Sequence, residues 1–128
     1  MNALEFRFAF YARDFDKSVQ FYRDTLGLKY IGGWDREDDK GALLSAGGTG
    51  VVEIFGEPQG KNYEGPSPVA VNLAMRLEDA SAVDTFYEKL AAKGTENLRA
   101  PKDYHYGHRS FRIIDPDNIP IYVYCELK

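Results

Sequence analysis

The feature that most constrains the fold of this chain is an internal repeat with an offset of 65 residues. Three identities recur at that spacing, namely Asp14 with Asp79, Phe21 with Phe86 and Tyr22 with Tyr87. Phe-Tyr pairs are common on amphipathic helices, so the repeat is informative mainly because the same order of predicted strands and helices accompanies it. We therefore interpret the chain as two copies of one module.

The first copy is predicted to be a βαβββ module. Residues 5–12 alternate between two sets of side chains, which is typical of a strand. Asp14 suits an N-cap and Gly27 suits a C′ position, so a helix is expected at about 16–26. Three further strands are expected at 28–34, 42–46 and 51–55.

The second copy follows a linker that is rich in Gly and Pro, at about 56–68. Its predicted elements are a strand at 69–77, a helix ending near 93–94, a short strand and a long aromatic loop within 95–108, and strands at 109–114 and 119–125 joined by a turn at 115–118. We expect an α+β fold in which modules at about 4–57 and 68–126 form a single domain with a ligand-sized cavity between sheets.

Strand alternation assigns the side chains to two faces. One parity is strongly apolar and is expected to pack under the helices: Phe6, Phe8, Phe10, Val52, Ile54, Val71, Leu73, Met75, Ile119, Ile121 and Val123. The other parity mixes small, polar and aromatic side chains, among them Arg7, Tyr11, Glu53, Phe55, Asn72, Tyr122 and Tyr124. This composition fits either a small-molecule cavity or a sheet or dimer interface, and alternation leaves both open.

Charge and cysteine content exclude several classes of function. With 16 basic and 20 acidic residues the net charge is −4, which disfavours nonspecific nucleic-acid binding. Cys125 is the only cysteine, so no intrachain disulfide forms, and its apolar surroundings predict a buried thiol. The sequence has no secretory leader pattern and no apolar run of membrane-spanning length, so we expect a cytoplasmic location without membrane contact.

Two motifs point to a known family. The first combines residues 13–18 with 21–28, and the second combines residues 107–109, Phe111 and the turn 115–118. Together they resemble the vicinal oxygen chelate superfamily of glyoxalases, bleomycin-resistance proteins and ring-cleaving dioxygenases. The resemblance implies paired βαβββ modules that form half-barrel sheets around a cavity, usually in homodimers and sometimes with modules exchanged between chains.

In metal-dependent members of this superfamily the ligands lie on the first and last strands of each module. The matching positions here hold Arg7, Glu53, Asn72 and Tyr122. Of these only Glu53 suits a metal, and the fixed charge of Arg7 would repel a divalent cation. We therefore expect no cofactor, and a pair between Arg7 and Glu53 with Asn72 and Tyr122 nearby. An ordinary cross-strand ion pair is the alternative.

Aromatic side chains outside these positions are further candidates. Trp34 lies beside an acidic turn and suits stacking on a planar or cationic ligand, although an edge-strand tryptophan beside a solvated turn is the simpler interpretation. Tyr104 and Tyr106 fall in a loop, 101–107, that is predicted to rim the cavity or to enter a dimer interface. His105 and His108 have HxxH spacing but no third ligand, which favours loop packing or ligand contact over zinc.

The sequence thus predicts a metal-independent small-molecule binding protein of the glyoxalase/bleomycin-resistance type, which sequesters a planar or cationic aromatic compound and acts as a homodimer. The incomplete ligand set favours a binding protein over an enzyme. Ligand contacts are expected from Arg7, Tyr11, Trp34, Glu53, Phe55, Asn72, Tyr104, Tyr106 and Tyr122. One alternative is a lyase, isomerase or dioxygenase with an atypical divalent-metal site at Glu53, and another is a regulatory or assembly partner.

Overall fold

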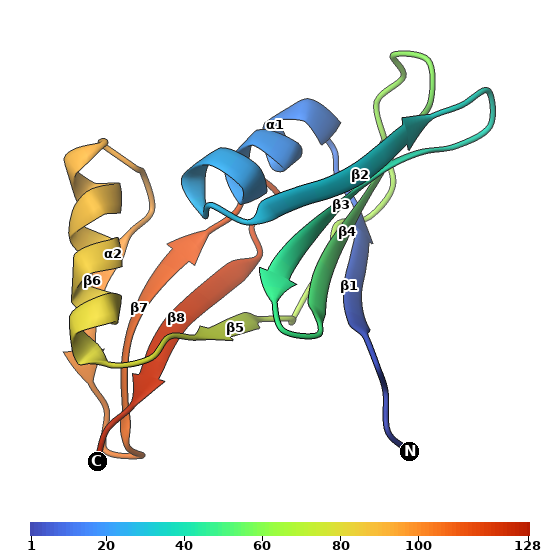
Figure 1. The fold of residues 1–128 in the computed structure, drawn as a ribbon. Helices are drawn as coiled ribbons and strands as arrows, with labels where there is room; N and C mark the ends of the chain where they lie inside the picture. Colours follow the sequence, from blue (N-terminus) through green and yellow to red (C-terminus); the bar gives the residue numbers. More distant parts are fainter. The chain divides into compact units, whose positions relative to one another are not determined.

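The computed structural model describes residues 1–128 and divides into two compact units, 1–68 and 69–128 (Figure 1). Each unit contains a helical segment and one four-stranded sheet. The predicted α+β fold of two βαβββ modules is therefore confirmed. That the two modules form one domain stays a prediction.

Unit 1 contains the first module. Its elements are β1 (Phe6–Tyr11), α1 (Phe15–Gln20), the π-helix η1 (Phe21–Thr25), β2 (Lys29–Asp35), β3 (Lys40–Gly47) and β4 (Gly50–Gly56). The strand order is β1-β4-β3-β2, with β1 parallel to β4 and the other pairs antiparallel. α1 lies against the sheet, where it contacts β4.

The helical segment of unit 1 begins as predicted and ends differently. The side chain of Asp14 accepts a hydrogen bond from the backbone N–H of Lys17 at 3.1 Å, which confirms the N-cap. A continuous α-helix over 16–26 is wrong, because the chain continues from Phe21 as a π-helix, in which the Leu26 N–H donates to the Phe21 carbonyl. The spacing of the apolar residues does not distinguish a π-helix from an α-helix over this single turn, because Leu26 lies on the buried side in both cases.

Unit 2 repeats the arrangement with a longer helix. Its elements are β5 (Leu73–Arg76), α2 (Ala80–Ala92), β6 (Arg99–Asp103), β7 (His108–Ile114) and β8 (Pro120–Glu126). The strand order is β5-β8-β7-β6, and β5 is parallel to β8. Asp79 caps α2 by accepting from the Ala82 N–H at 2.9 Å, so both aspartates of the 65-residue repeat have the same role.

Two predicted segments of unit 2 have different bounds in the structure. The strand expected at 69–77 begins only at Leu73, and Ala70 has a φ of 57°, a left-handed conformation that a strand does not contain. The loop expected at 101–107 is shorter, because its first three residues belong to β6. The remaining residues form a tight hairpin, in which the Tyr104 N–H donates to the His108 carbonyl at 2.8 Å.

The core of each unit lies between its sheet and its helical segment. Most of the predicted core residues of the inner strands are buried, and Cys125 is fully buried as expected. Phe6 and Val71 are not, with exposed fractions of 71% and 36%. Phe6 begins β1 and Val71 precedes β5, and both strands lie at the edge of a sheet. Alternation predicts the side of the sheet on which a residue lies, but not whether another element covers that side.

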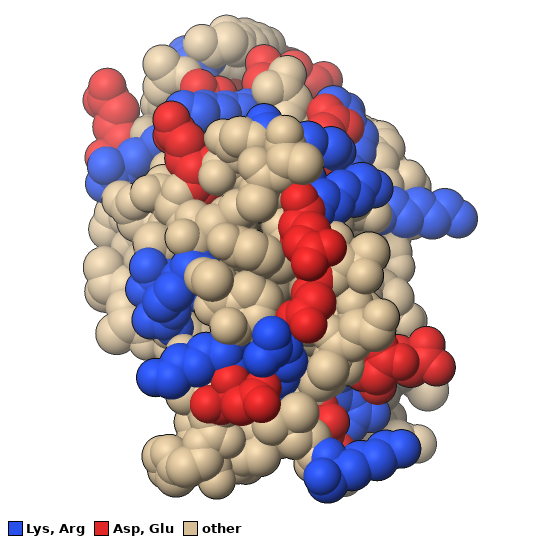
Figure 2. Space-filling model, turned by 90° about the vertical axis from the view of Figure 1, so that its left-hand side faces the viewer, with Lys and Arg blue, Asp and Glu red and all other residues tan.

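Charges of both signs share the surface that Figure 2 shows. Basic and acidic side chains are interspersed there, and no large area carries a single sign. This distribution agrees with the small net charge of −4. Neither α1 nor α2 is long and apolar enough to cross a membrane.

Candidate ligand-binding site

The predicted ligand-binding residues of unit 1 share one face of its sheet. Tyr11 of β1 is the register partner of Phe55 of β4. Phe55 also lies opposite Gly41 of β3, and Gly41 lies opposite Trp34 of β2. Cross-strand partners point to the same side of a sheet, so these positions form one row across all four strands. The alternate residues, such as Ile54, point to the other side and pack in the core.

This row forms a continuous run of aromatic rings. The ring centroids of Tyr11 and Phe55 are 5.1 Å apart, and Trp34 meets Phe55 edge-on at 6.5 Å. Tyr63, which belongs to the linker, stacks on Tyr11 at 4.9 Å and donates its hydroxyl proton to a linker carbonyl. Trp34 lies over Gly41, where any side chain would collide with the ring. The four rings give unit 1 an aromatic surface on this face.

Arg7 and Glu53 form the ion pair that the sequence predicts. Nη1 of Arg7 lies 3.4 Å from Oε1 of Glu53, and the side chains are 42% and 15% exposed. Arg7 also donates from Nε to Glu5, a partner that the sequence reasoning missed. The hydrogen bond to Glu5 raises the pKa of Arg7, and the contact with Glu53 adds to this effect, so the guanidinium stays charged.

The metal that the family resemblance implies does not fit this set of residues. Glu53 is the only carboxylate at the four matching positions, and it already faces a fixed positive charge. Neither unit contains three His, Cys, Asp or Glu side chains close enough together to hold an ion. A divalent cation at Glu53 would have to approach the guanidinium of Arg7, which opposes binding.

The mixed face of the unit 2 sheet carries a pocket of about 320 Å³. It is lined by Asn72, Ala74, Tyr106, His108, Ser110, Tyr122 and Tyr124. Three of these, Asn72, Tyr106 and Tyr122, were predicted as ligand contacts, and the pocket brings them together. A largely aromatic wall with an amide, an imidazole and a few hydroxyl groups is typical of sites for small molecules.

The aromatic side chains of this pocket support one another. His108 stacks on Tyr124 with a centroid distance of 4.4 Å, and Tyr106 meets His108 edge-on at 5.3 Å. Tyr104, also a predicted contact, does not line the pocket but stacks on Tyr106 at 5.4 Å. The hairpin therefore holds Tyr106 at the pocket edge.

The sequence placed Tyr124 on the mixed face and gave His108 a role in loop packing or ligand contact, and both line the pocket. Sequence reasoning missed Ser110 and Tyr63. Ser110 could have been found, because it is the cross-strand partner of Tyr124 within strands of known parity. Tyr63 had no such signal, since it belongs to an irregular linker without periodicity.

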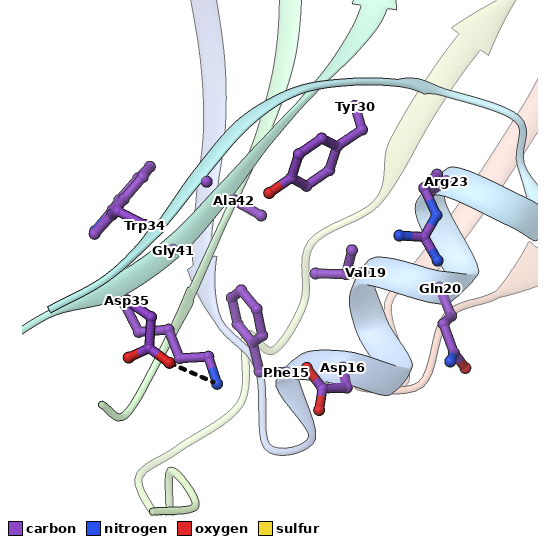
Figure 3. Close-up of a pocket in the computed structure, with 12 residues that line it drawn as sticks. Phe15, Asp16, Val19, Gln20, Arg23, Tyr30, Trp34, Asp35, Gly41 and Ala42 are labelled. Atoms are coloured by element: carbon purple, nitrogen blue, oxygen red, sulfur yellow. Dashed lines mark ion pairs between the residues drawn. The ribbon is translucent and has the colours of Figure 1, made fainter. Parts of the chain in front are cut away.

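Another cavity of unit 1 lies on the opposite side of the sheet, between α1 and strands β2 and β3 (Figure 3). It has a volume of about 570 Å³, and Tyr30 and Phe15 point into it, whereas Trp34 points away (Figure 3). Its basic groups are already engaged, with Arg23 bound to Asp24 and Lys40 lying 3.8 Å from Asp35. Trp34 is the only predicted ligand contact among the residues that line this cavity.

Comparison with known proteins gives matches that span nearly the whole chain. Residues 6–123 match the family model of the glyoxalase/bleomycin resistance protein/dioxygenase superfamily. The uncharacterized protein YraH of Bacillus subtilis (strain 168) is 33% identical over 120 residues, covering 87% of this chain and 89% of YraH. The crystal structure of SMU.1112c is 25% identical, with a TM-score of 0.79 and coverage of 97% and 98%. TnmS3, an antibiotic binding protein from Streptomyces sp. CB03234, is 18% identical, with a TM-score of 0.74 and coverage of 98% and 97%.

Proposed function

This chain belongs to the glyoxalase/bleomycin resistance protein/dioxygenase superfamily, and from that premise we propose that it binds a planar aromatic small molecule without a metal ion. Binding, and not conversion, is its function in this proposal. The ligand lies against the mixed face of a sheet, and sequestration of the compound is the biological outcome.

The observation that carries the proposal is the pocket on the unit 2 sheet. The rings of Tyr122, Tyr124 and His108 line it, and Asn72 adds an amide that can donate and accept hydrogen bonds. Aromatic walls bind planar compounds by apolar burial and stacking, without a reactive group. The aromatic run of unit 1 supports the same ligand class, and the antibiotic-binding function of TnmS3 gives a precedent for this fold.

Metal independence in this proposal rests on the contact between Arg7 and Glu53. Arg7 stands at a position that the family resemblance matches to a metal ligand, and its guanidinium neutralises the single suitable carboxylate. The second candidate is a lyase, isomerase or dioxygenase of the same superfamily. Its specific support is Glu53, a carboxylate of low exposure on the sheet face that could act as a base or as a lone metal ligand.

A homodimer in the cytoplasm belongs to the same proposal. Phe6 and Val71, at the edge strands of the two sheets, expose apolar surface that a second chain can cover. The single reduced cysteine suits a reducing compartment. Light scattering of the purified protein tests the oligomeric state, and a monomer at micromolar concentration would contradict this part.

Ligand binding is tested by thermal shift and calorimetry with a panel of planar aromatic compounds. The panel includes aromatic antibiotics and contains cationic, neutral and anionic compounds. We expect specific members to raise the melting temperature, because a ligand that binds only the folded state stabilises it by mass action. Tyr122→Ala should weaken binding of every hit. Tyr30→Ala, in the cavity on the helix side, is the matched control and should leave binding unchanged.

Two results would overturn the proposal. Elemental analysis that finds a stoichiometric metal required for turnover of a substrate would favour the enzyme. A panel without any hit, together with a protein partner captured by the purified chain and lost in Tyr122→Ala, would favour the regulatory or assembly role.

A further inference from the structure

Two arginines of unit 2 face each other across a strand pair. Arg99 of β6 is the register partner of Arg112 of β7, and Arg112 is in turn the partner of Tyr122 on β8. Cross-strand partners share one face, so both guanidinium groups belong to the face that carries the pocket. Like charges directly opposite each other destabilise a strand pair, so folding alone gives no reason for this arrangement.

Neither arginine has a carboxylate partner, in contrast to the other arginines of the unit. Arg76 and Arg109 form ion pairs with carboxylates at distances between 2.8 and 3.0 Å. Arg99 instead lies over the ring of Tyr122, 5.8 Å from its centroid. Nε of Arg112 is shielded from solvent and has no hydrogen-bond partner. A shielded donor without an acceptor costs free energy, which an acceptor on a ligand would recover.

A third basic residue adds to the positive charge of this face. Lys102 lies opposite Ser110, and its Nζ is 5.3 Å from the ring centroid of Tyr104, with no carboxylate partner. The acidic group of the same face, Glu126, is already engaged by Arg76. The face is therefore locally cationic, although the chain as a whole carries a net charge of −4.

The basic pair and the aromatic pocket meet at Tyr122. Its ring lines the pocket and also contacts Arg99, and Ser110 of the pocket lies two residues from Arg112 on the same strand face. Guanidinium groups bind oxyanions through two parallel hydrogen bonds, and two such groups side by side suit a single bound anion. A ligand that fills both regions has an aromatic ring and an acidic group attached to it.

We propose that Arg99 and Arg112 bind the oxyanion of an aromatic acid, a carboxylate or phosphate, whose ring lies against Tyr122 in the unit 2 pocket. This inference rests on the proposed function, and it specifies the charge of the ligand as negative. The anion relieves the repulsion between the two arginines and supplies the acceptor that Nε of Arg112 lacks.

The test compares three compounds that share one ring system: 2-naphthoate, 2-naphthyl phosphate and the neutral 2-naphthylmethanol. Binding to the full chain is measured by calorimetry at constant ionic strength. We expect at least one anion to bind about tenfold or more tightly than the alcohol, since charge-assisted bidentate bonds are the strong ones. The better anion identifies the acidic group. Equal affinities for all three would overturn the anion site and leave the proposed function intact.

The variants Arg99→Gln and Arg112→Gln should each remove most of the preference for the anion while the affinity for 2-naphthylmethanol stays the same. Both should fold, because each removes a like-charge contact. Arg76→Gln is the matched control, a guanidinium on the same face that is already paired, and it should keep the preference. A loss in Arg76→Gln as large as in Arg112→Gln would mean that only the general charge matters, which would overturn the assignment.

Two further measurements separate this inference from the proposed function. The Nε–Hε signal of Arg112 in a nitrogen–proton spectrum should shift on addition of 2-naphthoate, and an unchanged signal at saturation would contradict the contact. If no naphthyl compound binds, the proposed function fails for this pocket. The anion site is then tested by comparing the melting temperature in sulfate with that in chloride at equal ionic strength. A higher melting temperature in sulfate that Arg112→Gln abolishes would support the anion site. The absence of such a rise would overturn the anion site.

Discussion

Arg7 and Glu53 form an ion pair, 3.4 Å apart, on the adjacent parallel strands β1 and β4 of unit 1. Glu5 contacts the same guanidinium at Nε, so one fixed cation is shared by two carboxylates. Both residues of the pair stand at positions where the family resemblance implies metal ligands. A positive charge that belongs to the chain thus takes up the carboxylate that a metal would need.

Arg7→His should therefore make unit 1 receptive to a metal. The substitution removes the fixed charge and places a neutral imidazole near the free carboxylate of Glu53, two groups that coordinate Ni²⁺. We expect Ni²⁺ affinity about tenfold above that of the wild type, measured by calorimetry at neutral pH. Adding Glu53→Gln should abolish the gain. Tight stoichiometric Ni²⁺ binding by the wild type would contradict the role given to Arg7.

The contact between Trp34 and Gly41 predicts a specific sensitivity of the aromatic run. Gly41→Ala places a methyl group where the indole ring lies, so the ring must move away from Phe55. We expect the free energy of unfolding to fall by about 1–3 kcal/mol, as for other overpacked sites. Urea denaturation measures this loss, and the fluorescence of the single tryptophan should shift in the folded state.

Gly32→Ala is the control for this substitution. Gly32 lies in the neighbouring strand, and an added Cβ there would meet no atom within 4 Å. Its stability and fluorescence should match those of the wild type to within about 0.5 kcal/mol. Equal losses of stability in Gly41→Ala and Gly32→Ala would show that these strands do not accommodate a side chain at either glycine. The contact between Trp34 and Gly41 would then not be the cause.

Features governed by local spacing could be predicted from the sequence. The caps at Asp14 and Asp79 and the order of the elements depend on the number of residues between positions and on strand alternation. These rules hold wherever a regular helix or strand forms. The two modules can therefore be recognised from residue spacing together with the order of the elements. The pair between Arg7 and Glu53 was expected from the family resemblance, which matches both positions to metal ligands.

Features that depend on register or on irregular backbone could not be predicted in the same way. The opposition of Arg99 and Arg112 requires a strand pairing that an extra residue in β6 shifts, and no pattern in the sequence marks that irregularity. Tyr63 reaches Tyr11 from a linker without periodicity. The lining of the unit 2 pocket was accordingly predicted as ligand contacts only in part, through Asn72, Tyr106 and Tyr122.

The two capping aspartates predict matched losses of stability. Asp14→Ala and Asp79→Ala each leave a backbone N–H in the first helical turn without its acceptor. Each should lower the free energy of unfolding by about 1 kcal/mol, the usual value for such a cap. Asp16→Ala, in the first turn of α1 but without a capping hydrogen bond, is the control and should cost less. A negligible effect of both cap variants would contradict the common role of the repeat.

Arg109 joins three elements of unit 2, because it lies on β7 and contacts Asp84 of α2 and Asp103 of β6 at 2.8 and 2.9 Å. The hydrogen bond to Asp84, followed by that to Asp103, raises the pKa of Arg109, so the guanidinium stays charged at neutral pH. Arg109→Met keeps the apolar stem and removes both bonds. With a side chain 26% exposed, the loss should be about 1–2 kcal/mol in urea denaturation.

The loss should shrink in about 1 M salt, because screening weakens the two contacts in the wild type. Arg36→Met is the control, since Arg36 lies 3.9 Å from Asp39 in an exposed hairpin and should cost less than about 0.5 kcal/mol. If Arg109→Met proved as mild as Arg36→Met, α2 would be held to the sheet by its apolar face alone. The buried residues Val83 and Leu90 of α2 would then account for its position without Arg109.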